Sequence, residues 1–190
     1  DKLSYDYKKE FTPVAMLAPV PDRVPPRRAI FAANMETALN AVWDSGAGPG
    51  DRIVVVGAGV VGLLIARLCA RMPGTEVTVV DVASERAETA RALGCHFARP
   101  ESEPTGADVV FHASVTPQGL ATALHAAGFE GTIVEVSWFG DRATPVPLGG
   151  AFHSQRLKLI SSQVGQIATS RRPRWDYARR RDAALCLLDD

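Results

Sequence analysis

A glycine-rich turn at residues 57–62, with the sequence GAGVVG, carries the most specific chemical signature in this chain. It follows an apolar, β-branched run at 53–56 and precedes a stretch of helical composition at 63–71. In a G-x-G-x-x-G turn the first glycine lets the chain turn sharply, the second lets the backbone approach a pyrophosphate, and the third lets the helix pack closely on the strand. The first helical N–H groups and the helix dipole then face the anion. The predicted contact residues are Gly57, Gly59, Val60, Val61 and Gly62.

An acidic residue, Asp81, ends the next β-branched run, nineteen residues after Gly62. An acid at this position accepts hydrogen bonds from the ribose hydroxyls of an adenosine. The same carboxylate repels a 2′-phosphate, so it favours NAD over NADP. The first arginine that follows is Arg86, which we place either along the adenine face or in solvent on the next helix. The turn and the acid together predict a dinucleotide site. A ligand-free glycine turn and a methyltransferase loop are the alternatives, although the latter usually follows an acid in the first strand.

These residues need a sheet to hold them together, and the rest of the chain provides its elements. The expected strands are 53–56, 76–80, 95–98, 108–113, 131–136 and 156–162, and the expected helices are 27–45, 63–71, 84–93 and 118–127. Strands that alternate with helices in this way predict an α/β fold, a doubly wound Rossmann sheet with parallel strands and helices on both faces. Ligands of such sheets bind beyond the carboxyl ends of the strands. That edge would gather 57–62, 81, 114–116, 137–140 and 162–165.

The composition excludes several other classes of protein. The 190 residues hold 21 basic and 21 acidic side chains, a balance that gives no bulk signal for nucleic acid. No apolar run approaches the roughly 20 residues of a membrane-spanning helix, and the first ten residues lack the apolar core of a signal peptide. The three cysteines lie far apart, which excludes a disulfide framework and predicts a reducing compartment, the cytoplasm.

The remaining reactive side chains give weaker signals. His112 lies inside an expected strand, and we interpret it as a core histidine rather than a catalytic one. The other histidines have no spacing to cysteine or carboxylate that suggests a metal site. The arginine-rich stretch 171–181 has interleaved aromatic residues. We interpret it as a solvated loop that enters a helix near Pro173, with a nucleic-acid patch as the alternative.

Two longer stretches resemble a known family. The runs AANMETALNAVWDSGAGPGDRIVVVGAGVVGLL and TVVDVASERAETARALG are similar to the cofactor domain of the medium-chain dehydrogenase/reductase superfamily. The resemblance covers residues 1 to about 165. The later runs ISSQVG and RRPRWDYARRR resemble one subgroup, the bacteriochlorophyllide dehydrogenase and related zinc-type alcohol dehydrogenases.

The resemblance implies an NAD(P)-dependent oxidoreductase that acts on an alcohol or carbonyl substrate held between two domains. It implies that residues 1–28 are the remnant of an N-terminal GroES-like catalytic domain, most of which this chain lacks, that 29–165 form the cofactor-binding domain, and that 166–190 return toward the catalytic domain. It places Thr37 near the nicotinamide and Arg86 beside the adenine. Along the path of the nicotinamide it places Ser114 and the backbones of Val134, Ser162 and Val164. It also implies a homodimer formed through residues 143–165.

One departure from the family concerns zinc. The family often takes a zinc ligand (Cys, Asp or Glu) from the position that Ala33 occupies here, three residues before Glu36. We therefore expect no metal ligand and no catalytic zinc from this chain, and no catalytic proton donor is assigned.

Three other functions stay open. They are an NADPH-dependent quinone or enone reductase of the same superfamily, a nucleotide-binding regulatory module without catalysis, and nucleic-acid binding by the arginine-rich stretch.

Overall fold

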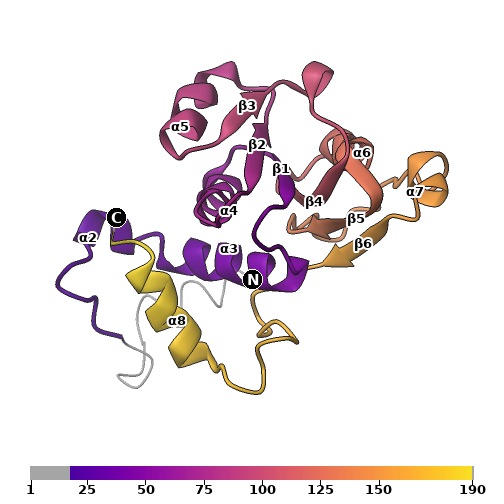
Figure 1. Cartoon of the computed structure of the whole chain (residues 1–190). Coiled ribbons are helices and arrows are strands. Elements are labelled where there is room, and N and C mark those ends of the chain that lie inside the picture. The colour runs from indigo at the N-terminus through magenta and orange to yellow at the C-terminus, as the bar shows by residue number, and fades with distance from the viewer. Residues whose placement is uncertain (1–17, 190) are drawn as a thin grey trace.

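The computed structural model describes residues 18–189, and within them the chain forms one six-stranded sheet with strand order β3-β2-β1-β4-β5-β6. Every strand pairs in parallel with its neighbours. Figure 1 shows the helices on both sides of this sheet, which confirms the predicted Rossmann fold. Residues 1–17, part of the predicted remnant of a catalytic domain, lie outside the described residues. The strands are β1 (Arg52–Val56), β2 (Glu76–Val80), β3 (His96–Ala98), β4 (Ala107–His112), β5 (Ala127–Glu135) and β6 (Lys158–Ser161).

Nine helical segments connect the described strands or flank them. The α-helices are α2 (Pro26–Ala29), α3 (Ala32–Ser45), α4 (Val60–Ala70), α5 (Ala87–Ala92), α6 (Pro117–Ala126), α7 (Ala151–Ser154) and α8 (Tyr177–Cys186), and the 3-10 turns are η2 (Ser84–Arg86) and η3 (Pro100–Ser102). None of these helices is long and apolar enough to cross a membrane.

Alternate side chains of the central strands face two separate cores, as the period of two along a strand requires. On one face Val55 and Phe111 pack with apolar residues of α3, α4 and α5. On the other face Val54 and Val110 pack with α6. Because both faces are covered, β1 reads as an unbroken apolar run in the sequence, which is typical of a buried parallel strand.

Four helix boundaries correct the sequence prediction. The helix expected over 27–45 is broken between α2 and α3, where the Phe31 N–H bonds to the Arg28 carbonyl in a tighter turn. Helix α4 begins at Val60, three residues earlier than expected. The helix expected over 84–93 begins only at Ala87, because Ser84 opens a 3-10 turn and its hydroxyl accepts from Arg99. Pro173 does not start the last helix, which begins at Tyr177 after a side-chain cap from Asp176.

Helix α8 is held against α3 by a buried polar network. Arg180 is 4% exposed, and it donates from Nε to Glu36 Oε1 (3.1 Å) and from Nη1 to Asn40 Oδ1 (3.0 Å). The Asn40 amide donates to Asp44 (3.0 Å), which also accepts from Ser162 Oγ (2.7 Å). A buried guanidinium needs such partners, because an unpaired buried charge is strongly destabilising. The network therefore fixes the chain that follows β6 onto the sheet domain.

Two other arginines of the 171–181 stretch lie over aromatic rings. Arg179 lies 4.1 Å from the ring centre of Trp175, and Arg171 lies 5.4 Å from that of Trp43. The two tryptophan rings are themselves 4.6 Å apart. Cation–π contacts of this kind give these basic and aromatic residues a role within the fold.

The three cysteines should differ sharply in reactivity. Cys69 and Cys95 are buried and Cys186 is exposed. Burial raises the pKa of the Cys69 thiol to about 12, and it also raises the pKa of Cys95 above its usual value. Since the thiolate is the reactive form, we expect one thiol to react with Ellman's reagent at pH 8 in the folded protein and three after unfolding. Cys186→Ser should remove the fast reaction, and a second fast thiol in the folded protein would contradict this assignment.

Candidate functional site

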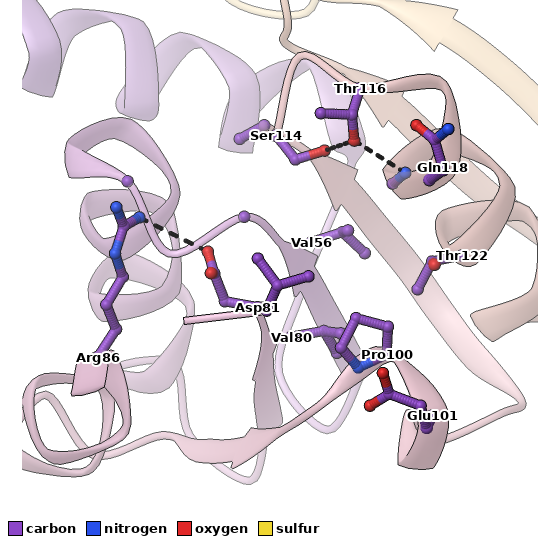
Figure 2. Close-up of a pocket in the computed structure, with 15 residues that line it drawn as sticks. Val56, Val80, Asp81, Arg86, Pro100, Glu101, Ser114, Thr116, Gln118 and Thr122 are labelled. Atoms are coloured by element: carbon purple, nitrogen blue, oxygen red, sulfur yellow. Dashed lines mark hydrogen bonds and ion pairs between the residues drawn. The ribbon is translucent and has the colours of Figure 1, made fainter. Parts of the chain in front are cut away.

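A cavity of about 490 Å³ opens at the carboxyl ends of β1, β2 and β4 (Figure 2). Its walls come from the glycine turn after β1, from the residues that follow β2 and β3, and from the start of α6. This is the sheet edge at which doubly wound folds bind their ligands. Of the residues predicted from the sequence, the cavity gathers Gly57, Gly59, Asp81, Arg86 and Ser114.

The three glycines of the turn differ in what an added side chain would contact. Gly57 has φ +110°, and a Cβ there would lie 2.8 Å from the carbonyl carbon of Ala113. A Cβ on Gly62 would overlap the carbonyl oxygen of Gly57, so this position requires glycine for helix α4 to pack against the turn. Gly59 differs, because a Cβ there would meet no protein atom within 4 Å and φ is an ordinary −73°. Gly59 lines the cavity, so the missing side chain leaves space for something other than protein.

Helix α4 begins directly after this space, with Gly59 as its extended N-cap. The N-cap has no side chain that could satisfy the first N–H groups of the helix, which belong to Val60 and Val61. A helix start with uncapped donors and a positive dipole end favours an anion.

The Asp81 carboxylate does more than the sequence predicts. Its Oδ2 accepts from the backbone N–H of Ala58 (2.6 Å), and its Oδ1 accepts from that of Ala83 (2.8 Å). The Arg86 guanidinium lies 3.6 Å from Oδ2. Asp81 therefore ties the glycine turn to the end of β2 and still offers free lone pairs to the cavity that it lines. Arg86 forms an ion pair with Asp81 at the cavity. The sequence alone leaves its position open between the adenine face and solvent.

The opposite wall contains a hydrogen-bonded chain that begins at His112. This residue is fully buried, as predicted for a core histidine. Its Nδ1 lies 2.7 Å from Glu135 Oε2, and its Nε2 lies 2.8 Å from Ser114 Oγ. We assign a hydrogen to Nδ1 because an ionised carboxylate only accepts. Ser114 Oγ in turn lies 3.0 Å from Thr116 Oγ1, which accepts from the Gly119 N–H at the start of α6. The chain fixes the position of the Ser114 hydroxyl at the cavity wall.

Val115, next to Ser114, is held in a strained backbone conformation. Its φ of 57° lies in the left-handed region, which β-branched residues rarely adopt. We expect Val115→Asn to raise the free energy of unfolding by about 1 kcal/mol, because asparagine tolerates this conformation and such strain costs roughly 1–3 kcal/mol. Urea unfolding measures the effect. Val115→Ile is the matched control and should not gain stability, and an asparagine variant less stable than the native chain would show that the strain is compensated.

Several residues of the cavity were not predicted as site residues. Thr116, Gln118 and Thr122 line it from α6 and its cap, and Pro100 and Glu101 line it from η3. Thr116 was placed at the sheet edge only as part of the loop 114–116. A threonine directly before a proline is typical of a helix start, and the Thr116 side chain caps α6 by accepting from the Gly119 N–H. Nothing in the spacing of the others could show that they face the same cavity.

Seven predicted residues do not line this cavity: Val60, Val61 and Gly62 at the start of α4, and four residues from elsewhere in the chain. The Thr37 hydroxyl donates to the carbonyl of Ala33 within its own helix (3.1 Å), and Val134 is fully buried in β5. Ser162 bonds to Asp44, and Val164 follows β6. Their roles toward a nicotinamide stay predictions. Among residues 18–189 no group of three potential ligands could hold a metal ion. Glu36, the nearest acid to Ala33, is paired with Arg180.

The comparisons with known proteins agree with this geometry. Residues 59–178 match the zinc-binding dehydrogenase family. The chain belongs to this family. It is therefore part of the medium-chain dehydrogenase/reductase superfamily, as its sequence resemblance predicted. The closer resemblance to one subgroup stays a prediction.

The zinc-binding dehydrogenase relatives include proteins of known activity. The chain is 33% identical over 147 residues to an uncharacterised zinc-type alcohol dehydrogenase-like protein of Haemophilus influenzae, covering 71% of this chain and 42% of the relative. It is 26% identical over 174 residues to D-guloside 3-dehydrogenase of Escherichia coli, covering 85% and 50%. Among solved structures, an alcohol dehydrogenase from Thermus sp. ATN1 matches with a TM-score of 0.72 and 26% identity, over 90% of this chain and 50% of that one. The chain thus spans about half the length of these relatives.

Proposed function

We propose that this chain is the NAD-binding part of an alcohol dehydrogenase-like oxidoreductase. The observation that carries the proposal is the open space at Gly59, which lies in front of uncapped helical N–H groups and beside a carboxylate. A bound NAD would supply a nicotinamide that exchanges a hydride with an alcohol or carbonyl carbon. The residues of this chain do the binding: the backbone at 59–61 holds the pyrophosphate, and Asp81 accepts from the ribose hydroxyls. The proposed substrate is a small alcohol or carbonyl compound.

The wider organisation is also part of the proposal. We place the cofactor domain at 29–165, with 1–28 and 166–190 contributing to a neighbouring catalytic domain. A homodimer through 143–165 is supported by the position of β6 at the edge of the sheet, where its outer side has no strand partner among the described residues. A cytoplasmic location is supported by the unpaired cysteines.

A second candidate has one specific observation in its favour. Arg86 lies 3.6 Å from Asp81 and is exposed enough to turn toward a ligand. An arginine at this position can bind a 2′-phosphate, which an NADPH-dependent quinone or enone reductase would need. The Asp81 carboxylate opposes this candidate, because it would lie against the same phosphate.

Calorimetric titration of the chain with NADH and with NADPH tests the proposal. We expect NADH to bind in about the micromolar range, and NADPH to bind at least about tenfold more weakly. Tighter binding of NADPH would favour the reductase. If neither nucleotide binds, the proposal for this chain is wrong, and a regulatory role without nucleotide chemistry becomes the better interpretation.

A further inference from the structure

The cavity continues past Asp81, away from the glycine turn, and this further part is lined by both apolar and polar side chains. Pro100 lies on one side of it, and Gln118 and Thr122 of α6 lie on the other (Figure 2). Val82, the residue after Asp81, also lines the cavity. If the pyrophosphate lies at the turn and the ribose at Asp81, the base of the nucleotide has to lie in this further part. The apolar Val82 and Pro100 side chains can pack on the face of a flat ring, which leaves the edge of the ring to the polar residues.

Glu101 is the charged residue at this end of the cavity, and its carboxylate is held in place. Its own backbone N–H and the Arg99 guanidinium bond to it, with Arg99 Nε 3.3 Å from Oε2, and these bonds hold the pKa of Glu101 below its usual value. Arg99 also donates from Nη1 to the Val82 carbonyl (2.8 Å) and to Ser84 Oγ (3.0 Å). One arginine therefore joins the loop after β2 to the loop after β3 and aligns the carboxylate with the cavity wall.

We propose that Glu101 selects the base of the bound dinucleotide by accepting a hydrogen bond from the 6-amino group of adenine. An ionised carboxylate has acceptors and no donor. Adenine presents an amino donor at its position 6, whereas guanine and hypoxanthine present a carbonyl oxygen there. Two acceptors repel each other, so the carboxylate favours adenine and opposes 6-oxopurines. The inference rests on the proposed dinucleotide site, and it adds the residue that determines the base.

The test compares NADH with its reduced hypoxanthine analogue, which has an oxygen in place of the 6-amino group and a hydrogen on the neighbouring N1. Titrations of the chain are followed by nicotinamide fluorescence. We expect the native chain to bind NADH about three- to tenfold more tightly than the analogue, a modest ratio because Glu101 is largely exposed. In Glu101→Gln the ratio should fall to within about twofold of one, because an amide can accept from an amino group and donate to a carbonyl oxygen.

Glu88→Gln is the matched control, because Glu88 is an exposed acid on α5 that does not line the cavity. This variant loses the same charge and should keep the native ratio. Thermal unfolding of each variant checks that the fold is unchanged. Equal binding of the two nucleotides by the native chain, or an unchanged ratio in Glu101→Gln, would overturn the inference while NADH binding still supports the proposed function. Failure of the native chain to bind NADH would overturn both.

Discussion

A methyl group added at Gly59 should weaken NADH binding by at least about tenfold and leave the fold intact. The Cβ of Gly59→Ala enters open space and meets no protein atom within 4 Å, and the backbone there suits any residue. Alanine is a poorer N-cap than glycine, so the expected loss of stability is roughly 0.5–1 kcal/mol, which the fold can tolerate. The new methyl group would occupy the space in which the pyrophosphate approaches the backbone. Calorimetry with NADH and urea unfolding of the same sample measure both effects.

Gly62→Ala is the matched comparison for Gly59→Ala. It adds the same methyl group three residues later, but here the methyl overlaps the carbonyl oxygen of Gly57. Helix α4 would have to move away from the turn, and we expect a loss of stability of about 2–3 kcal/mol, in the range of overpacked cores. Binding by Gly59→Ala equal to that of the native chain would mean that the space beside the turn does not receive the pyrophosphate.

Replacing Asp81 with serine should reverse part of the preference for NAD. The substitution removes the carboxylate that opposes a 2′-phosphate and releases Arg86, 3.6 Å away, to bind that phosphate. We expect NADH affinity to fall about tenfold or more and the NADPH-to-NADH affinity ratio to rise by at least that factor. Titration with both nucleotides gives the ratio directly. A ratio that stays at the native value would show that Asp81 does not contact the ribose.

The structure adds a stability cost to this substitution that the sequence does not indicate. Asp81 accepts the backbone N–H groups of Ala58 and Ala83, and both donors lose their partner in the serine variant. The expected loss is about 1–3 kcal/mol, the cost of leaving such groups unsatisfied. The double variant Asp81→Ser with Arg86→Ala separates the two effects. It should be as unstable as the single variant, and it should lose the gain in NADPH affinity.

The parts of the fold that follow from short-range patterns could be predicted. The glycine turn, the acid after β2 and the strands all depend on neighbours within about thirty residues, so the sheet and one wall of the cavity were predictable. Helix α4 starts earlier than its β-branched first residues suggest, because packing against β1 outweighs their weak helix propensity. The break at Ile30 and Phe31 follows from contacts between distant parts of the chain, since Met35 of α3 and Leu188 near the C-terminal end pack in one cluster.

The residues of the other wall of the cavity could not be predicted, because only the folded structure brings them together. Gln118 and Thr122 are one turn apart on α6, where a polar pair usually faces solvent. Only the position of α6 beside β4 shows that they face a cavity. Glu101 and Arg99 likewise read as surface charges, and the Arg99 contacts with Val82 and Ser84 give them a defined arrangement. The network around His112 needs Glu135 from the neighbouring strand, and no local pattern indicates which strand that is.

Residues 23–28, near the start of the described chain, lie against its last residues, 188 and 189, although the two segments are far apart in sequence. Arg23 forms an ion pair with Asp189 (3.2 Å), and Arg28 Nη1 donates to the Asp189 carbonyl (2.7 Å). Val24 and Leu188 are buried in the same apolar cluster, and Figure 1 shows the C-terminal end beside α2. A domain connected through both segments would therefore be attached at one place on the sheet domain. For the same reason a circular permutant that joins residue 189 to residue 23 with a short linker should keep the sheet and its cavity.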